Sequence, residues 1–332
     1  MKTVPLVGYS NKLSGRPGDS IEFMVSSEFD ADYTAQLFRS ISADPNPDGS
    51  GIVEQCCDML FSKQSFPSRQ QNFYPGSYGL TELGLQLEAR HLVRFSVFIY
   101  PTLRCNNEQS ILDYGRYGLA LNTQGNVVLR ADENTVTSTD TVKLRCWYRV
   151  EGLIEASGEI SLTLERADGS QPISKALSHT GSEMKLRQTA QIIIAARLTS
   201  DSINFYFNGK IESPQIYEDD QALALWDFSH DISSMSVPGQ SCSDLKLINA
   251  PTRAVTSALW DASEMNWLHK PNHYAAIAFH QDSIYDFNWK PDFGFVIPDN
   301  MPSGIYVMRI ACGAHYDCLL YTSPSPRDYT RS

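Results

Sequence analysis

Hydrophobic and polar residues alternate along most of the chain, in short runs separated by turn residues. Residues 21–25 alternate after a Pro-Gly-Asp turn, and residues 33–41 place every second side chain on one side. A period of two is typical of β-strands, because successive side chains point to opposite faces. These runs predict two strands, whereas residues 44–51, half of them Pro or Gly, predict a loop.

Longer and more evenly spaced strands are predicted from about residue 76. Residues 92–100 alternate, with apolar positions on one face. Two further stretches, residues 118–130 and 144–166, indicate hairpins, because apolar runs flank a glycine-containing connection. Many short strands and few runs of helical period favour an all-β fold. The length of the strands favours a concanavalin- or laminin-G-like jelly roll of two large sheets.

The two ends of the chain each supply too few strands to bury a core alone. We therefore expect residues 1–72 and the closing strands of 236–317 to form one smaller Ig-like sandwich. Residues 73–235 would then be a jelly roll inserted into it, with a linker at the start of 236–317. Tyr306, at the start of a predicted strand, resembles the tyrosine corner of Greek-key sandwiches. A plain half-buried strand tyrosine is the alternative.

The last residues, 318–332, break the character of the chain. They closely resemble one reading frame of a transposase adapter used in sequencing libraries, and we expect them to be an artefact. Two prolines in Ser323-Pro324-Ser325-Pro326 forbid a helix or a central strand. The stretch is therefore left out of the predicted fold. A genuine flexible tail is the alternative.

Composition narrows the class of protein. The chain has 332 residues, 42% of them hydrophobic and 20% charged, which is ordinary for a soluble globular protein. The net charge of −11 argues against a nucleic-acid partner, which would need clustered basic residues. No apolar run is long enough to predict a membrane span, and the N-terminus does not resemble a secretory signal. Seven irregularly spaced cysteines predict reduced thiols in a cytoplasmic protein.

Four residues are candidates for binding. If the apolar run at 274–279 is a strand that continues, His280 and Asp282 lie two apart on one face and could share a metal or a proton. A structural hydrogen-bonded pair, or simple surface placement, is the alternative. Trp226 and Trp267 could stack on sugar rings, and core or interdomain packing is the alternative for both. No catalytic residue and no metal site is predicted.

Seven segments together resemble the large (beta) subunit of N,N-dimethylformamidase. They follow one another in the order expected for that family: residues 8–18, 37–51, 75–78, 207–212, 249–255, 273–280 and 297–306. The resemblance implies β-sandwich material placed before a catalytic domain. It also implies a mononuclear iron held by two tyrosines and a glutamate, a small helical subunit and a homo-oligomer. The family places those iron ligands beyond residue 317, so none is assigned to this chain.

Two functions are therefore expected from the sequence. The first is a non-catalytic, N-terminal scaffold and interface region of an iron-dependent amide hydrolase. Such a region would lack the catalytic domain and would contain no iron of its own. The alternative is a lectin-like carbohydrate-binding protein that uses the jelly-roll face. A purely structural sandwich protein is a third possibility.

Overall fold

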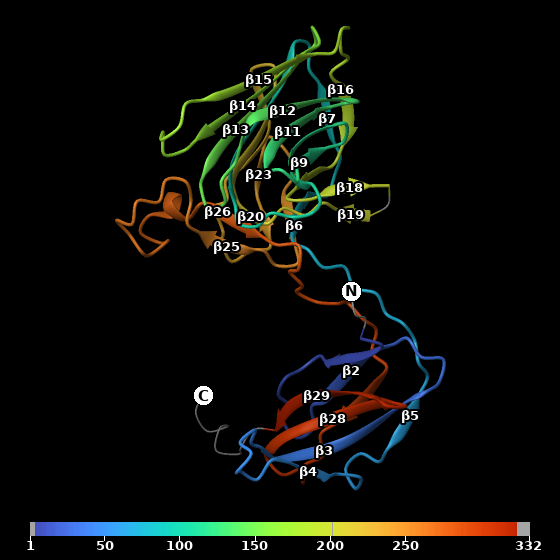
Figure 1. Ribbon diagram of the computed structural model, residues 1–332. Helices are drawn as coiled ribbons and strands as arrows, with labels where there is room; N and C mark the ends of the chain where they lie inside the picture. The colour runs from blue at the N-terminus through green and yellow to red at the C-terminus, as the bar shows by residue number, and fades with distance from the viewer. Residues whose placement is uncertain (1–3, 201, 324–332) are drawn as a thin grey trace. The chain divides into compact units, whose positions relative to one another are not determined.

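The computed structural model describes residues 4–200 and 202–323, and β-strands dominate it (Figure 1). Contacts divide the chain into two compact units. Unit 1 joins the two ends of the chain, Met1–Tyr74 and Phe287–Ser332, and unit 2 is the continuous stretch Pro75–Asp286. The predicted all-β class, with one sandwich inserted into another, is confirmed.

Unit 1 is a small sandwich of two sheets. One sheet has three strands, in the order β1 (Leu6–Ser10), β2 (Ser20–Ser27) and β27 (Phe293–Val296). The other contains β29 (His315–Ser323), β28 (Gly304–Cys312), β3 (Tyr33–Ala43) and β4 (Ile52–Cys56), with β5 (Gln64–Phe66) also paired to β3. Their inner faces share one core, which includes Phe23, Leu37 and Ile310. Strands from both ends of the chain are therefore required to close it.

Tyr306 forms the predicted tyrosine corner. Its side chain is fully buried at the start of β28, and its phenol donates a hydrogen bond to the carbonyl of Pro302 at 2.5 Å. The bond spans four residues and fixes the chain as it enters the strand.

Residues 318–323 are part of the fold. They complete β29, which pairs with β28 along its whole length, from Gly304 opposite Ser323 to Cys312 opposite His315. Leu319 and Tyr321 are buried because alternate residues of the strand face the core. The expectation that nothing after residue 317 contributes to the core is therefore wrong for 318–323. Residues 324–332 lie outside the described residues.

Unit 2 is a larger sandwich. Its first sheet has eight strands, in the order β12 (Asn134–Thr141), β11 (Asn126–Ala131), β10 (Tyr117–Leu121), β9 (Gln109–Tyr114), β17 (Ile192–Ile194), β6 (Tyr78–Thr81), β24 (Leu245–Ile248) and β22 (Ser236–Val237). The second contains β15 (Ser174–His179), β14 (Glu159–Arg166), β13 (Tyr148–Glu155), β8 (Leu92–Pro101), β20 (Gly209–Glu218), β21 (Gln221–Trp226) and β23 (Gly239–Gln240), with β26 (Ala276–Phe279) and β25 (Thr252–Val255) attached at β20.

Smaller elements complete unit 2. Two separate two-stranded ladders join β7 (Leu85–Glu88) to β16 (Arg187–Ala190) and β18 (Arg197–Thr199) to β19 (Ser202–Asn204). A single turn of 3-10 helix, η1, covers Pro271–Tyr274.

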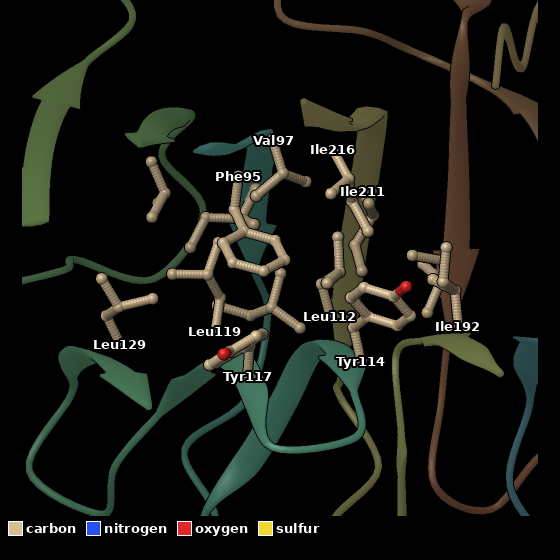
Figure 2. Packing of buried hydrophobic residues seen from close by; sticks show 14 of the residues in the cluster. Phe95, Val97, Leu112, Tyr114, Tyr117, Leu119, Leu129, Ile192, Ile211 and Ile216 are labelled. Carbon is tan, nitrogen blue, oxygen red and sulfur yellow. The ribbon is translucent and has the colours of Figure 1, made fainter. Parts of the chain in front are cut away.

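The two large sheets of unit 2 meet face to face over an apolar core. Phe95 and Val97 of β8 point toward Leu112 of β9 and Leu119 of β10, and all four are fully buried (Figure 2). Burial of such side chains supplies the main driving force for folding.

The boundary of unit 2 differs from the predicted one. Residues 236–286 were expected to form a linker and the closing strands of unit 1, yet they pack in unit 2. The reason is β26, which pairs with β20 so that Ile277 lies opposite Ile211. Ile277 and Phe279 enter the core of unit 2. The buried strand predicted at 274–279 is thus present, but it extends the larger sandwich.

Candidate functional site

His280 and Asp282 do not share a strand face. Strand β26 ends at Phe279, and both residues are exposed in the segment that follows it. The backbone of His280 is held by Ser77: its N–H donates to Ser77 Oγ at 2.9 Å, and its carbonyl accepts from Ser77 N–H at 2.9 Å. These bonds fix the path of the chain and leave the imidazole out of the contact. A metal or proton shared by His280 and Asp282 remains without support.

The two candidate tryptophans have different surroundings. Trp226 is 2% exposed in the core of unit 2, and its indole N–H donates to the carbonyl of Ser243 at 3.3 Å. A side chain in that position cannot stack on a sugar, so the packing alternative holds for Trp226. Trp267 is 37% exposed and lies in a long excursion between β25 and β26.

That excursion, residues 256–275, is called the apolar loop here. Figure 1 shows it in orange, standing away from the strands of unit 2. Five of its large apolar side chains are between 37% and 72% exposed: Leu259, Trp260, Met265, Trp267 and Leu268. Single exposed apolar residues are normal, but a cluster of five on one segment is typical of an interaction surface.

The base of the apolar loop is held by two charged residues of β20, the half-buried Lys210 and the buried Glu212. Ile211 faces the core, so Lys210 and Glu212 face the outside of the sheet. Lys210 Nζ donates to Thr256 Oγ1 at 2.6 Å, and Glu212 Oε2 accepts a hydrogen bond from the N–H of Ala258 at 2.7 Å. Both bonds reach the first residues of the loop.

Burial perturbs both of these charged groups. Burial raises the pKa of Glu212 to about 7, while the N–H of Ala258 opposes this rise and nearby Asp227 adds to it. Burial also lowers the pKa of Lys210. The ammonium of Lys210 lies 4.8 Å from the centre of the Tyr100 ring, within range of a cation–π contact. The loop is therefore fixed at its base by groups whose charge is costly to bury.

A contact within the loop closes it. Ser257 Oγ donates to the carbonyl of Asn272 at 2.7 Å, and Ser257 N–H donates to the carbonyl of His273 at 2.9 Å. These bonds join the beginning of the loop to η1 near its end. The exposed side chains between them are thus presented by a closed, anchored segment.

A separate cleft lies at one end of unit 2. It has a volume of about 450 Å³, and three segments line it: residues 103–108 between β8 and β9, residues 204–206 between β19 and β20, and Gln281. Beneath it, Asn208 is 1% exposed and contacts both Gln109 and Cys105 through its side-chain amide. The cleft is polar and open, with aromatic rings from Phe205 and Tyr206 in its wall.

Among residues 4–200 and 202–323, no group of three or more His, Cys, Asp or Glu side chains is placed to hold a metal ion. In the same part of the chain, no helix is long and apolar enough to cross a membrane.

No family model matches the chain. Two curated proteins do, and both are N,N-dimethylformamidase beta subunits: the Paracoccus aminophilus protein is 27% identical over 98% of this chain, and the Alcaligenes sp protein is 26% identical over 93%. The chain resembles N,N-dimethylformamidase beta subunits. The resemblance carried by the seven segments is confirmed, at a distant level. The chain spans about half the length of these N,N-dimethylformamidase subunits, 50% and 48% respectively.

The matches among solved structures are more distant. A SAP-like pentraxin from Limulus polyphemus has a TM-score of 0.35 and 12% identity, covering 57% of this chain and 77% of the pentraxin. Scytalido-glutamic peptidase has a TM-score of 0.32 and 11% identity, covering 63% of this chain and all of the peptidase. The all-β class rests on the strands of the chain itself.

Proposed function

We propose that this chain is the scaffold and subunit-binding part of an amide hydrolase of the N,N-dimethylformamidase type. The proposal rests on the similarity to N,N-dimethylformamidase beta subunits, which extends over 98% of this chain. The chain in turn covers only half of the relative. The catalytic residues, and the iron expected from the resemblance, then belong to the half of the relatives that the chain does not cover. The chain by itself is inactive in this proposal.

The apolar loop supplies the contact surface in this proposal. Its exposed Trp267 is the kind of residue that dominates binding energy when a partner covers it, and the exposed Leu259 adds apolar area. The relatives are named beta subunits, so those enzymes contain a further subunit. We assign the loop to that partner, a small helical subunit, and we expect the complete protein to be a homo-oligomer of such pairs. A positively charged rim on the partner would complement the net charge of −11.

A cytoplasmic location is part of the same proposal. All seven cysteines are free, including the exposed Cys56 and the buried Cys312. Free thiols in this number are typical of a reducing compartment.

Co-purification with a partner subunit tests the proposal. The chain would be co-expressed with the partner subunit of the Paracoccus aminophilus enzyme. The affinity of the purified chain for that subunit would then be measured by biolayer interferometry. The Leu259→Ser, Trp267→Ser double variant should bind at least about tenfold more weakly, because an aromatic hot-spot side chain and a further exposed apolar side chain are lost. Met59→Ser is the matched control, because Met59 is 98% exposed and lies in unit 1. Absence of binding, or equal binding by the double variant, would refute the assignment of the loop.

A further inference from the structure

The buried side-chain amide of Asn208 holds the segments around the cleft of unit 2 together. Asn208 Oδ1 accepts a hydrogen bond from the backbone N–H of Gln281 at 3.1 Å. Its Nδ2 donates to Gln109 Oε1 at 3.2 Å and to Cys105 Sγ at 3.3 Å. Gln109 in turn donates to the carbonyl of Leu103 at 3.1 Å. One side chain thus joins all three segments of the cleft, so its shape does not depend on a ligand to order it.

Phe205 is held in an unusual conformation at the cleft wall. Its φ is +57°, in the left-handed region that bulky residues avoid. The guanidinium of Arg197 lies 4.1 Å from the centre of the Phe205 ring. One face of the ring is therefore covered while the side chain still lines the cleft. Such strain persists only where the surroundings impose it, and here it presents an aromatic surface to the cleft.

The one carboxylate among the described residues of the cleft lining is already paired. Glu108 forms an ion pair with Arg197 at 2.7 Å. The guanidinium of Arg104 donates to the carbonyls of Gln124 at 2.5 Å and of Val142 at 3.0 Å, which hold it in place but leave its charge unpaired within the described chain. A cationic ligand would have to break the Glu108–Arg197 pair to find an opposite charge. The cleft therefore disfavours a cationic ligand.

Besides Arg104, the exposed polar side chains in the lining are carboxamides. Asn106, Asn107 and Gln281 all line the cleft and are exposed to solvent. Each carboxamide offers two donor hydrogens and one acceptor oxygen, a set that matches the adjacent hydroxyl groups of a sugar ring. The volume of about 450 Å³ is within the range of small-molecule sites.

We propose that this cleft binds a neutral saccharide of one or two rings. The apolar face of a sugar ring would lie on Phe205, and its hydroxyls would bond to Asn106 and Asn107. The site is independent of the amide-hydrolase proposal, because it uses no residue of the apolar loop.

Titration with simple sugars tests this inference. Cellobiose, maltose, lactose and N-acetylglucosamine would be titrated into the full chain and followed by saturation-transfer NMR. We expect at least one to bind saturably in the millimolar range or tighter. The Asn106→Ala, Asn107→Ala double variant and Phe205→Leu should each weaken that sugar at least about tenfold. Gln221→Ala, an exposed glutamine at the start of β21, should leave it unchanged.

Three results would overturn the inference. They are the absence of saturable binding by all four sugars, equal binding by wild type and the double asparagine variant, and tighter binding of glucuronate than of the neutral sugars. Near-UV circular dichroism of each variant separates a lost contact from a lost fold. The double asparagine variant changes only exposed side chains, so it keeps the test open if Phe205→Leu does not fold.

Discussion

The pH dependence of stability provides a direct test of the buried anchor at Glu212. Only 5% of the residue is exposed, and burial raises the pKa of its carboxyl to about 7 from an ordinary value of 4.5. Between these two values Glu212 is protonated in the folded chain and ionised in the unfolded chain. Unfolding then releases a proton, so stability falls as pH rises through this window. At 1.36 kcal/mol per pH unit, the loss is roughly 3 kcal/mol.

Replacement of Glu212 by Gln isolates this effect. The carboxamide keeps an acceptor oxygen for the N–H of Ala258 and removes the charge. Urea unfolding at pH 4.5, 6.0 and 7.5 should show the variant close to wild type at the lowest pH and roughly 3 kcal/mol more stable at the highest. Glu133→Gln, at an exposed position of the same unit, is the control. A difference between Glu212→Gln and wild type that does not change with pH would refute the reasoning.

Three further changes test other parts of the fold. Tyr306→Phe removes the hydrogen bond to the carbonyl of Pro302 and should lower the free energy of unfolding in urea by about 1 kcal/mol. An unchanged unfolding midpoint would contradict a stabilising role for the tyrosine corner. Phe95→Ala empties a fully buried position between the sheets of unit 2 and should cost about 3–5 kcal/mol by the same assay. Lys210→Met removes the ammonium bond to Thr256 and should speed chymotrypsin cleavage within the apolar loop about tenfold, whereas an unchanged rate would exclude Lys210 as an anchor.

Much of the strand pattern was predictable because alternation records which face is buried. The stretch at 92–100 became β8, and the closing strands of unit 1 were recognised from their turn and from Tyr306. These features depend only on residues that are close in the sequence, so the sequence pattern alone is enough to predict the strands.

The strand β29 was missed for a physical reason. Residues 319–323 alternate between buried and exposed positions, but the prolines that follow give the whole segment the composition of a flexible tail. Pairing with β28 outweighs that composition, because the partner strand supplies both hydrogen bonds and a core face for Leu319. The partner is the preceding strand, joined through the turn at Gly313 and Ala314, so the two strands form a hairpin.

The candidate sites were less accessible to sequence reasoning. Trp226 and Trp267 look alike in the sequence, yet one is in the core and the other is exposed, because only tertiary packing separates them. Lys210 and Glu212 flank an apolar residue in a strand, a pattern that normally indicates a solvated face. The loop that folds over them, 46 residues later in the chain, buries Glu212 and half-buries Lys210. The role of Asn208 likewise depends on two distant segments, residues 105–109 and Gln281.

The central proposal is that this chain supplies the scaffold of an amide hydrolase and that the catalytic centre belongs to the half of the relatives that the chain does not cover. The most direct measurement is dimethylamine release from N,N-dimethylformamide by the purified chain, with its iron content determined on the same sample. The account predicts no release above the buffer rate and less than one iron per chain. Turnover by the chain alone, or stoichiometric iron, would contradict it.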